Sequence, residues 1–437
     1  MQIDNLELTN FKNYSHLSIE FQPGVNLFVG SNGSGKTSIL EAINVALGGF
    51  FASQEQKMQR VIEFDEIKIT KGKREPTSTV LAKSHVIEGN WSRTIKRDTK
   101  TNDGKFLKSA LEYGQNFFKA FDNPEDNTIA PLISYYSCQR LFKDSSSSEK
   151  QKFDLEAGRR NGYLQCLKEK AIKPILNDWL GKAFTLNEIK KSKNIPTIDL
   201  SLANVELAIE KTLNKLLNIP NIFSLHIYQN PFYDNELFLQ YDDEHDLPLS
   251  YYSDGFRNIL YLVIDLVWRA SQLNPWLNLE QITEQVNGVV TIDEIDLHLH
   301  PKWQSIAVEL IQSLFPKVQF FITTHSPTVV ANFQNGTLYL IAENQISEIT
   351  TKFFGKQINT VLREILGAQD RHKPTQDKID LLLRMIGNYA PEQEINILLS
   401  ELTESLGADD IDIQRAIALI DWNKIMVMTY FSVLKNY

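Results

Sequence analysis

The alternation of apolar and polar residues is clearest in the first 50 positions. Leu17, Ile19 and Phe21 alternate with polar residues, and this period of two predicts a half-buried strand. Residues 25–29 form a short apolar run, which predicts a buried strand. Apolar residues then recur at helical spacing over 39–47 and stop at two glycines. The pattern therefore predicts a strand, a glycine-rich loop and a helix in succession.

The rest of the chain returns to an α/β pattern after two less regular segments. Residues 51–130 carry short alternating runs and predict an antiparallel β region, and residues 141–200 predict a helical insertion. The α/β pattern resumes at about residue 201, with one strongly apolar helix at 255–270. The runs that predict buried strands in this part are 289–292, 318–322 and 338–341. Residues 355–437 predict a cluster of short amphipathic helices.

Composition narrows the class of protein. The chain has 437 residues, of which 42% are hydrophobic, enough for one large α/β domain with added parts or for two domains. No apolar stretch approaches the length needed to cross a bilayer, and the N-terminus lacks the features of a signal peptide. Two cysteines do not make a disulfide framework. We therefore expect a cytoplasmic protein without a membrane contact.

A glycine-rich loop supplies the first candidate chemistry. It matches the pattern G-x-x-x-x-G-K-[ST] and consists of Gly30, Ser31, Asn32, Gly33, Ser34, Gly35, Lys36 and Thr37. Glycines let the backbone wrap around phosphate oxygens, and the helix that follows adds its positive N-terminal end. Lys36 would reach the β- and γ-phosphates, and the Thr37 hydroxyl would take a Mg²⁺ position. The alternative is a glycine-rich turn that happens to contain Lys-Thr, but its place between a buried strand and a helix favours phosphate binding.

Two further strand ends carry polar groups suited to the same chemistry. Asp293 and Glu294 follow the apolar strand that begins at Gly288, so Asp293 could hold Mg²⁺ and Glu294 could deprotonate a water. His325 follows another apolar strand and could contact the γ-phosphate or the attacking water. Taken alone, Asp293 and Glu294 could be solvated acids and His325 an ordinary loop histidine. Taken together with the glycine loop, the three residues indicate one nucleotide site.

The start of the long apolar helix has two interpretations. Ser253, Asp254 and Gly255 suit the N-terminal cap of a helix. The same geometry suits contact with the γ-phosphate of a nucleotide held by a second subunit. Spacing along the sequence does not separate these interpretations.

Taken in order, these motifs resemble those of the ABC ATPase superfamily. Three segments are similar to the RecF- and SMC-like branch and to the OLD-like AAA ATPases, namely Asp293-Glu-Ile-Asp-Leu-His-Leu-His-Pro-Lys-Trp-Gln304, Thr323-Thr-His-Ser-Pro327 and Pro131-Leu-Ile-Ser-Tyr-Tyr-Ser-Cys-Gln-Arg140. Two C-terminal segments, 354–367 and 402–416, resemble the tail of the PtuA ATPases of Septu anti-phage systems and of some retrons.

The resemblance implies a fold and a division of the chain. The fold is an α/β P-loop head of the ABC type, with a mixed sheet, an antiparallel β subdomain, a helical insertion and a helical C-terminal region. Four parts follow: an N-terminal ATPase lobe at 1–140, the insertion at 141–200, a C-terminal ATPase lobe at 201–350, and the helical region at 351–437.

It also implies roles for particular residues. Ser253 and Gly255 fall on the signature motif that contacts ATP from a second protomer, although Tyr252, Asp254 and Phe256 depart from the transporter pattern. Gln139 falls near the Q-loop glutamine, a contact to ATP and Mg²⁺. Lys12 falls where related ATPases place a basic residue that contacts the nucleotide; a solvated surface lysine is the alternative. His298 and His300 fall on the D-loop, and a histidine pair alone makes a weak metal site.

The function implied is ATP hydrolysis by a homo-oligomer, at least a dimer, in which each ATP lies between two protomers. Resemblance to PtuA implies control of an effector nuclease of the HNH type, similar to PtuB, in anti-phage defence. No nuclease motif is found in this chain. A RecF-like DNA-repair ATPase and a scaffold with little ATP turnover remain as alternatives.

The chain is acidic, with a net charge of −9, but residues 57–100 are rich in lysine and arginine. This region leaves DNA open as a partner, with a solvated mixed-charge face as the alternative.

Overall fold

The computed structural model describes most of the chain in two compact units. The described residues are 1–54, 58–103, 106–123, 125–138, 157–168, 176, 178–183, 186, 193, 200–217, 226–230, 236–240, 246–351, 353–365, 367 and 371–434. The first unit spans Met1–Val361 and the second Leu362–Tyr437.

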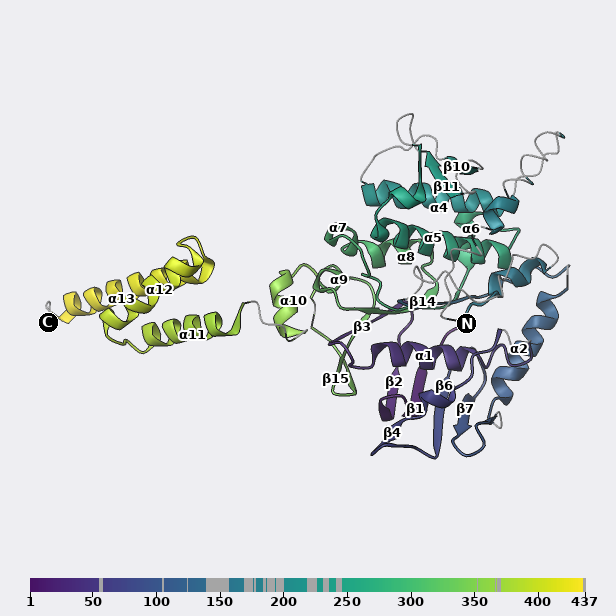
Figure 1. Ribbon diagram of the computed structural model, residues 1–437, viewed down its shortest axis with the longest axis horizontal. Coiled ribbons are helices and arrows are strands. Elements are labelled where there is room, and N and C mark those ends of the chain that lie inside the picture. Colours follow the sequence, from purple (N-terminus) through teal and green to yellow (C-terminus); the bar gives the residue numbers. More distant parts are fainter. Residues whose placement is uncertain are drawn as a thin grey trace. The chain divides into compact units, whose positions relative to one another are not determined.

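A six-stranded sheet forms the centre of the first unit (Figure 1). Its order is β16-β15-β3-β14-β13-β9, and all neighbours are parallel except the β15–β16 pair. The strands are β3 (Val25–Gly30), β9 (Leu132–Tyr136), β13 (Gly288–Ile292), β14 (Val318–Thr324), β15 (Thr337–Ala342) and β16 (Gln345–Glu348). Every residue of β3, β9, β13 and β14 is buried, as expected for strands covered on both faces. The apolar runs predicted as strands are thus confirmed.

Parallel pairing places the functional ends of these strands at one edge of the sheet. Thr324 of β14 pairs with Val29 of β3, and Ile292 of β13 pairs with Ile322 of β14. Each strand therefore ends at nearly the same level, next to the glycine loop after β3. Helix α1 (Lys36–Leu47) covers one face of the sheet, and α5 (Asp254–Leu273) lies on the other (Figure 1).

A five-stranded antiparallel sheet packs beneath α1, in the order β2-β1-β6-β7-β8. Its strands are β1 (Asn5–Phe11), β2 (Tyr14–Glu20), β6 (Thr77–Lys83), β7 (Asn90–Lys96) and β8 (Asn102–Asp103). Trp91 and Arg93 of β7 donate hydrogen bonds to the carbonyls of Ala46 and Gly48 at the end of α1. These bonds fasten the sheet to the helix that follows the glycine loop.

The prediction for residues 51–130 is correct for the strands but wrong for one segment. Residues Lys108–Phe121 form helix α2, because Ala110, Gly114, Phe118 and Phe121 recur at helical spacing and are buried. Gly114 lies directly against the backbone of Phe50, where a larger residue would not fit. The helical spacing is hard to recognise in the sequence because short runs of alternating apolar and polar residues occur in the same region.

The remaining elements of the first unit surround the sheet. They are β4 (Ile69–Thr70), β5 (Lys73–Arg74), α4 (Leu200–Leu217), β10 (His226–Asn230), β11 (Glu236–Gln240), β12 (Asp246–Pro248), α6 (Leu279–Gln285), α7 (Pro301–Gln304), α8 (Ala307–Leu314), α9 (Pro327–Ala331) and α10 (Ile358–Glu364). Much of the insertion predicted at 141–200 lies outside the described residues. Its described part includes a 3-10 helix at Gly158–Tyr163. The arrangement is a mixed α/β fold with an antiparallel β subdomain, as the sequence predicts.

The second unit is helical, as predicted for the C-terminal region. Its helices are α11 (Lys373–Gly387), α12 (Glu392–Leu406) and α13 (Ile411–Leu434). They share a small apolar core that consists of Ile379, Leu382, Ile386, Ile395, Leu402, Ile413 and Ala416. Arg371 pairs with Asp410 and Asp412 and so links the start of the unit to α13. Within the described residues, no helix is long and apolar enough to cross a membrane.

A buried charged network joins α5 to β9. The Asp265 carboxylate accepts hydrogen bonds from the Tyr136 hydroxyl at 2.6 Å and from Arg269 Nε at 2.7 Å. Arg269 also donates to the carbonyls of Gly162 and Leu164. Burial by itself would lower the pKa of Arg269, but the charge of Asp265 raises it above its usual value. The guanidinium is therefore held charged inside the core by a single carboxylate.

We predict that Asp265→Ala destabilises the first unit by about 3–5 kcal/mol, because it leaves the buried guanidinium of Arg269 without its counter-charge. Tyr136→Phe removes one hydrogen bond and should cost about 1.5–3 kcal/mol. Chemical denaturation followed by tryptophan fluorescence measures both values. An Asp265→Ala variant as stable as the unsubstituted protein would contradict this account of the network.

Candidate nucleotide site

The loop between β3 and α1 has the backbone that its glycines allow. Gly33 and Gly35 have φ values of +77° and +102°, which favour glycine. A side chain at Gly35 would also collide with the Tyr14 hydroxyl and the Asn13 amide. The loop therefore turns tightly in front of α1, with the N-terminal end of a 12-residue helix behind it.

Lys36 lies inside this loop and its side chain points back over it. Its ammonium donates hydrogen bonds to the carbonyl oxygens of Gly30 at 3.0 Å and Ser31 at 2.9 Å. Burial lowers the pKa of Lys36, and the charges of Asp293 and Glu294 oppose this shift. A buried cation in a glycine-rich loop at the start of a helix suits an anionic ligand.

Thr37 and Asp293 meet across the edge of the sheet. The Thr37 hydroxyl donates to Asp293 Oδ2 at 2.9 Å, although 256 positions separate the two residues. Asp293 is 2% exposed, and its other oxygen accepts from the Thr323 hydroxyl at 2.6 Å. The carboxylate is thus oriented from both sides by hydroxyl groups, one in the first turn of α1 and one near the end of β14.

Glu294 is held in an unusual backbone conformation next to Asp293. Its φ is +50°, and its N–H donates to the Thr323 hydroxyl at 2.8 Å. Left-handed geometry is uncommon for a residue with a long side chain and costs about 1–3 kcal/mol. Thr323 therefore orients both acids, Asp293 through its side chain and Glu294 through its backbone.

His325 follows β14 on the same edge of the sheet. Burial and the positive charge of Lys36 lower the pKa of His325, while Asp296 and Asp293 act in the opposite direction. This shift favours the neutral imidazole, which can exchange hydrogen bonds without adding charge.

These residues line one cavity of about 500 Å³. Its lining is Lys12, Asn13, Asn32, Gly33, Gly35, Lys36, Thr37, Ser38, Asp293, Glu294 and His325. The structure thus brings together the glycine loop, both strand-end acids, the histidine and Lys12, as the sequence predicts. Gln139 lies outside the described residues. Asn13, Ser38 and the orienting Thr323 were not predicted as site residues, although Thr323 belongs to a recognised motif.

The predicted signature residues do not line this cavity. The Ser253 hydroxyl accepts a hydrogen bond from the Phe256 N–H at 3.4 Å, which is the N-terminal cap of α5. Asp254 pairs with Arg257 on the same helix. Gly255 packs against the backbone of His298, where a Cβ atom would collide with the carbonyl oxygen. Capping is therefore observed in the structure, and contact with a nucleotide would require a second protomer.

His300, one of the two histidines predicted to lie on the D-loop, has a local structural role. His300 Nδ1 accepts from the Lys302 N–H at 3.3 Å and caps α7. In the part of the chain that the structure describes, no three histidine, cysteine or acidic residues gather as metal ligands would. The geometry therefore gives no support to a metal site on His298 and His300.

Several cations of the 57–100 region are occupied within the protein. Arg93 is buried against α1, Arg60 pairs with Glu66, and Lys83 pairs with Glu7. Two further cations, Arg74 and Lys100, lie over the ring of Phe64. The local count of basic residues therefore overstates the charge available to a phosphate backbone.

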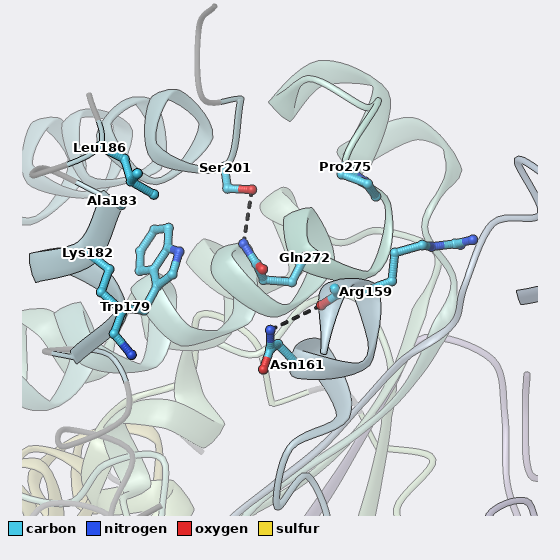
Figure 2. Close-up of a pocket in the computed structure, with 10 residues that line it drawn as sticks. Arg159, Asn161, Trp179, Lys182, Ala183, Leu186, Ser201, Gln272 and Pro275 are labelled. Carbon is cyan, nitrogen blue, oxygen red and sulfur yellow. Dashed lines mark hydrogen bonds between the residues drawn. The ribbon is translucent and has the colours of Figure 1, made fainter. Parts of the chain in front are cut away.

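A second cavity, of about 350 Å³, lies beside the C-terminal end of α5 (Figure 2). Gln272 donates to the Ser201 hydroxyl at 3.2 Å on its wall, and Trp179 lies beside it. The guanidinium of Arg159 turns away from the cavity in Figure 2 and is held by backbone carbonyls. Lys182 pairs with Asp178. Among the described residues, the lining of this second cavity contains neither paired acids nor a glycine loop.

Several known proteins are similar to this chain over most of its length. The "Retron Ec83 probable ATPase" of Escherichia coli is 25% identical, over 94% of this chain and 85% of the relative. The "Septu protein PtuA" of Bacillus thuringiensis is 23% identical, over 85% of this chain and 86% of the relative. The "DNA replication and repair protein RecF" of Clostridium botulinum (strain ATCC 19397 / Type A) is 27% identical, but over 52% of this chain and 58% of the relative.

A solved structure and a family model also match. An SMC head bound to the C-terminal winged-helix domain of ScpA covers 80% of this chain with 17% identity and a TM-score of 0.45. The family model covers residues 25–331, which include the glycine loop, both acids and His325 and amount to more than half of the chain. The chain therefore belongs to the family described as "AAA domain, putative AbiEii toxin, Type IV TA system".

Proposed function

We propose that this protein binds ATP with Mg²⁺ and hydrolyses it to ADP and phosphate. The observation that carries this proposal is the contact between Thr37 and Asp293 at 2.9 Å, at the mouth of the loop that encloses Lys36. A hydroxyl and a carboxylate beside a backbone phosphate loop are the Mg²⁺ ligands of P-loop enzymes.

The residues present fit such a ligand. Thr37 offers a hydroxyl oxygen and Asp293 a carboxylate oxygen. Both are hard oxygen ligands, the kind that Mg²⁺ prefers. The Ser34 hydroxyl in the loop is buried without a hydrogen-bond partner in the described structure, so it is suited to a phosphate oxygen. Bound Mg²⁺ would supply charge neutralisation of the phosphates.

Glu294 is the proposed general base. Its carboxylate takes a proton from water, the water oxygen bonds to the γ-phosphorus, and the bond to the bridging oxygen of ADP breaks. Lys36 stabilises negative charge on the phosphates, and the neutral His325 positions the water or the γ-phosphate. Thr323, which accepts from the Glu294 N–H, keeps the base in place.

Each ATP is proposed to lie between two protomers arranged head to tail. Ser253, Asp254 and Gly255 do not line the protomer's own cavity, so their helix end is available to the nucleotide of a partner. Because one site then contains parts of both chains, ATP binding favours association and hydrolysis favours release.

The biological role proposed is control of an effector in anti-phage defence. Support comes from the retron and Septu relatives, which align over most of the chain, whereas the RecF match covers about half of it. An HNH nuclease similar to PtuB is the proposed effector, and cytoplasm the proposed location. Phage challenge of cells with and without the gene and its neighbours tests this role; protection that persists with Lys36→Ala would count against it.

Lys36→Ala is predicted to abolish ATP binding, because it removes the cation enclosed by the loop. Isothermal titration with ATP and Mg²⁺ measures the effect. Lys71→Ala, which removes an exposed lysine elsewhere, is the control and should bind ATP normally. Equal affinity of the two variants would exclude the loop as the phosphate site.

Glu294→Gln is predicted to keep ATP binding and to lower turnover about 100-fold or more, because the base is lost while the shape is kept. The variant should accumulate as an ATP-bound dimer, measured by light scattering with and without ATP. Glu280→Gln, on the exposed surface of α6, is the matched control. Wild-type turnover by Glu294→Gln would show that another group is the base.

Ser253→Asp separates the two interpretations of the signature. Aspartate caps a helix about as well as serine, so folding stability should stay nearly unchanged. Its negative charge would face the γ-phosphate of a partner, so ATP-dependent association and turnover should be lost. If Ser253→Asp associates and hydrolyses ATP normally, Ser253 serves only as a cap.

A further inference from the structure

The residues on either side of His325 are held by side-chain hydrogen bonds. The Thr324 hydroxyl donates to Asp296 Oδ1 at 2.5 Å and accepts from the Ser326 N–H at 3.0 Å. The second of these bonds spans His325 and closes a tight turn around it. Thr324 is fully buried and Ser326 is 5% exposed. The backbone that carries the imidazole is therefore fixed from inside the protein.

Gln304 holds the other side of this turn with both ends of its amide. The amide oxygen accepts from the Ser326 hydroxyl at 2.7 Å, and the amide nitrogen donates to the Leu299 carbonyl at 3.0 Å. A carbonyl can only accept, so Leu299 fixes which end of the amide is the nitrogen. The amide oxygen is thereby directed to Ser326, next to His325.

The partners of this turn belong to one segment, 295–304, which follows the proposed base. The same segment supports the start of α5, because Gly255 packs against the backbone of His298 and Asn258 donates to the Leu297 carbonyl at 2.9 Å. Segment 295–304 therefore contacts both the start of α5 and the turn at His325.

The bond between Gln304 and Ser326 also joins two motifs of the sequence. Gln304 ends the segment that begins at Asp293, and Ser326 lies in Thr323–Pro327. The two residues are 22 positions apart, and neither lines the nucleotide cavity. Direct contact with ATP in their own protomer therefore does not account for them.

We propose that Gln304 is a positioning residue for His325, which it acts on by holding Ser326. This proposal rests on the function proposed above, in which His325 positions the water or the γ-phosphate. A misplacement of about 1 Å in such a group can lower a rate about a hundredfold. The phosphates themselves are gripped by the glycine loop, so the loss of Gln304 should affect turnover and spare ATP binding.

Gln304 gives a cleaner test of this positioning than Asp296, which holds the other side of the turn. Burial lowers the pKa of Lys36 and of His325, and the negative charge of Asp296 opposes both shifts. A substitution of Asp296 would therefore change the electrostatics of the site as well as its geometry. Gln304 is uncharged, so its replacement by another uncharged residue changes the hydrogen bonds alone.

Gln304→Met keeps the length of the side chain and removes both hydrogen bonds. Turnover should fall about tenfold to a hundredfold, while ATP affinity, measured in the Glu294→Gln background, stays unchanged. Gln312→Met is the matched control, because the Gln312 amide is also half-buried and also donates to a backbone carbonyl, that of Asn335 at 3.1 Å. Gln312→Met should leave turnover unchanged.

Two double-mutant cycles identify the path of the effect. Ser326→Ala removes the other end of the same hydrogen bond, so the double variant should lose little more turnover than the weaker single variant. In a His325→Ala background, Gln304→Met should cause no further loss. If Gln304→Met does not fold, Ser326→Ala in these two backgrounds carries the test.

Nuclear magnetic resonance of the histidine Cε1–H groups gives a readout that does not depend on hydrolysis. The His325 signal is assigned by its disappearance in His325→Ala. Gln304→Met should shift or broaden this signal, and Gln312→Met should leave it in place.

The outcomes separate this proposal from the function on which it rests. If the unsubstituted protein does not hydrolyse ATP, the proposed function fails, and the His325 signal alone decides whether Gln304 positions the imidazole. Unsubstituted turnover by Gln304→Met, or a loss of ATP affinity that matches the loss of turnover, would overturn the positioning role. An equal loss from Gln304→Met with and without His325 would also overturn it, since the effect would then bypass the histidine.

Discussion

The hydrogen bond between Thr37 and Asp293 is the contact on which the site depends, and it is a consequence of sheet topology. Neither residue is near the other in sequence, but β3 and β13 are both neighbours of β14 in a parallel sheet. Parallel strands in register end at one edge, so the loop after β3 and the acid after β13 must approach each other. Any change that shifts the register would separate the loop from the acids.

The packing of α1 extends this constraint to the second sheet. Trp91 and Arg93 satisfy carbonyl groups at the C-terminal end of the helix, while Glu41 in the middle of the helix pairs with Lys12 of the β1–β2 turn. The helix behind the phosphate loop is therefore held to the antiparallel sheet at its middle and at its C-terminal end.

The sequence predicted the central fold and the main site residues because their signals are local. Each apolar run with a polar end has the length and composition of a buried strand, and the glycine loop is recognisable in eight residues. Helix α2 was not predicted, because the helical spacing of its apolar residues stands out only when residues 108–121 are considered apart from the neighbouring segments. The partners of Lys12 could not be predicted, since Glu41 and Glu66 reach it through folding and not through spacing.

The packing of the predicted signature residues bears on the proposed head-to-tail dimer. Gly255 rests on the backbone of His298, and Asn258 donates to the carbonyl of Leu297 at 2.9 Å, so the start of α5 is packed on the loop that follows Glu294. A helix end fastened there cannot swing into its own cavity without breaking those contacts. Its polar cap is nevertheless joined, through that same loop, to the proposed base. In the proposed dimer, contact by a partner's nucleotide at Ser253 would act on a segment continuous with Glu294, and this segment would connect the two sites.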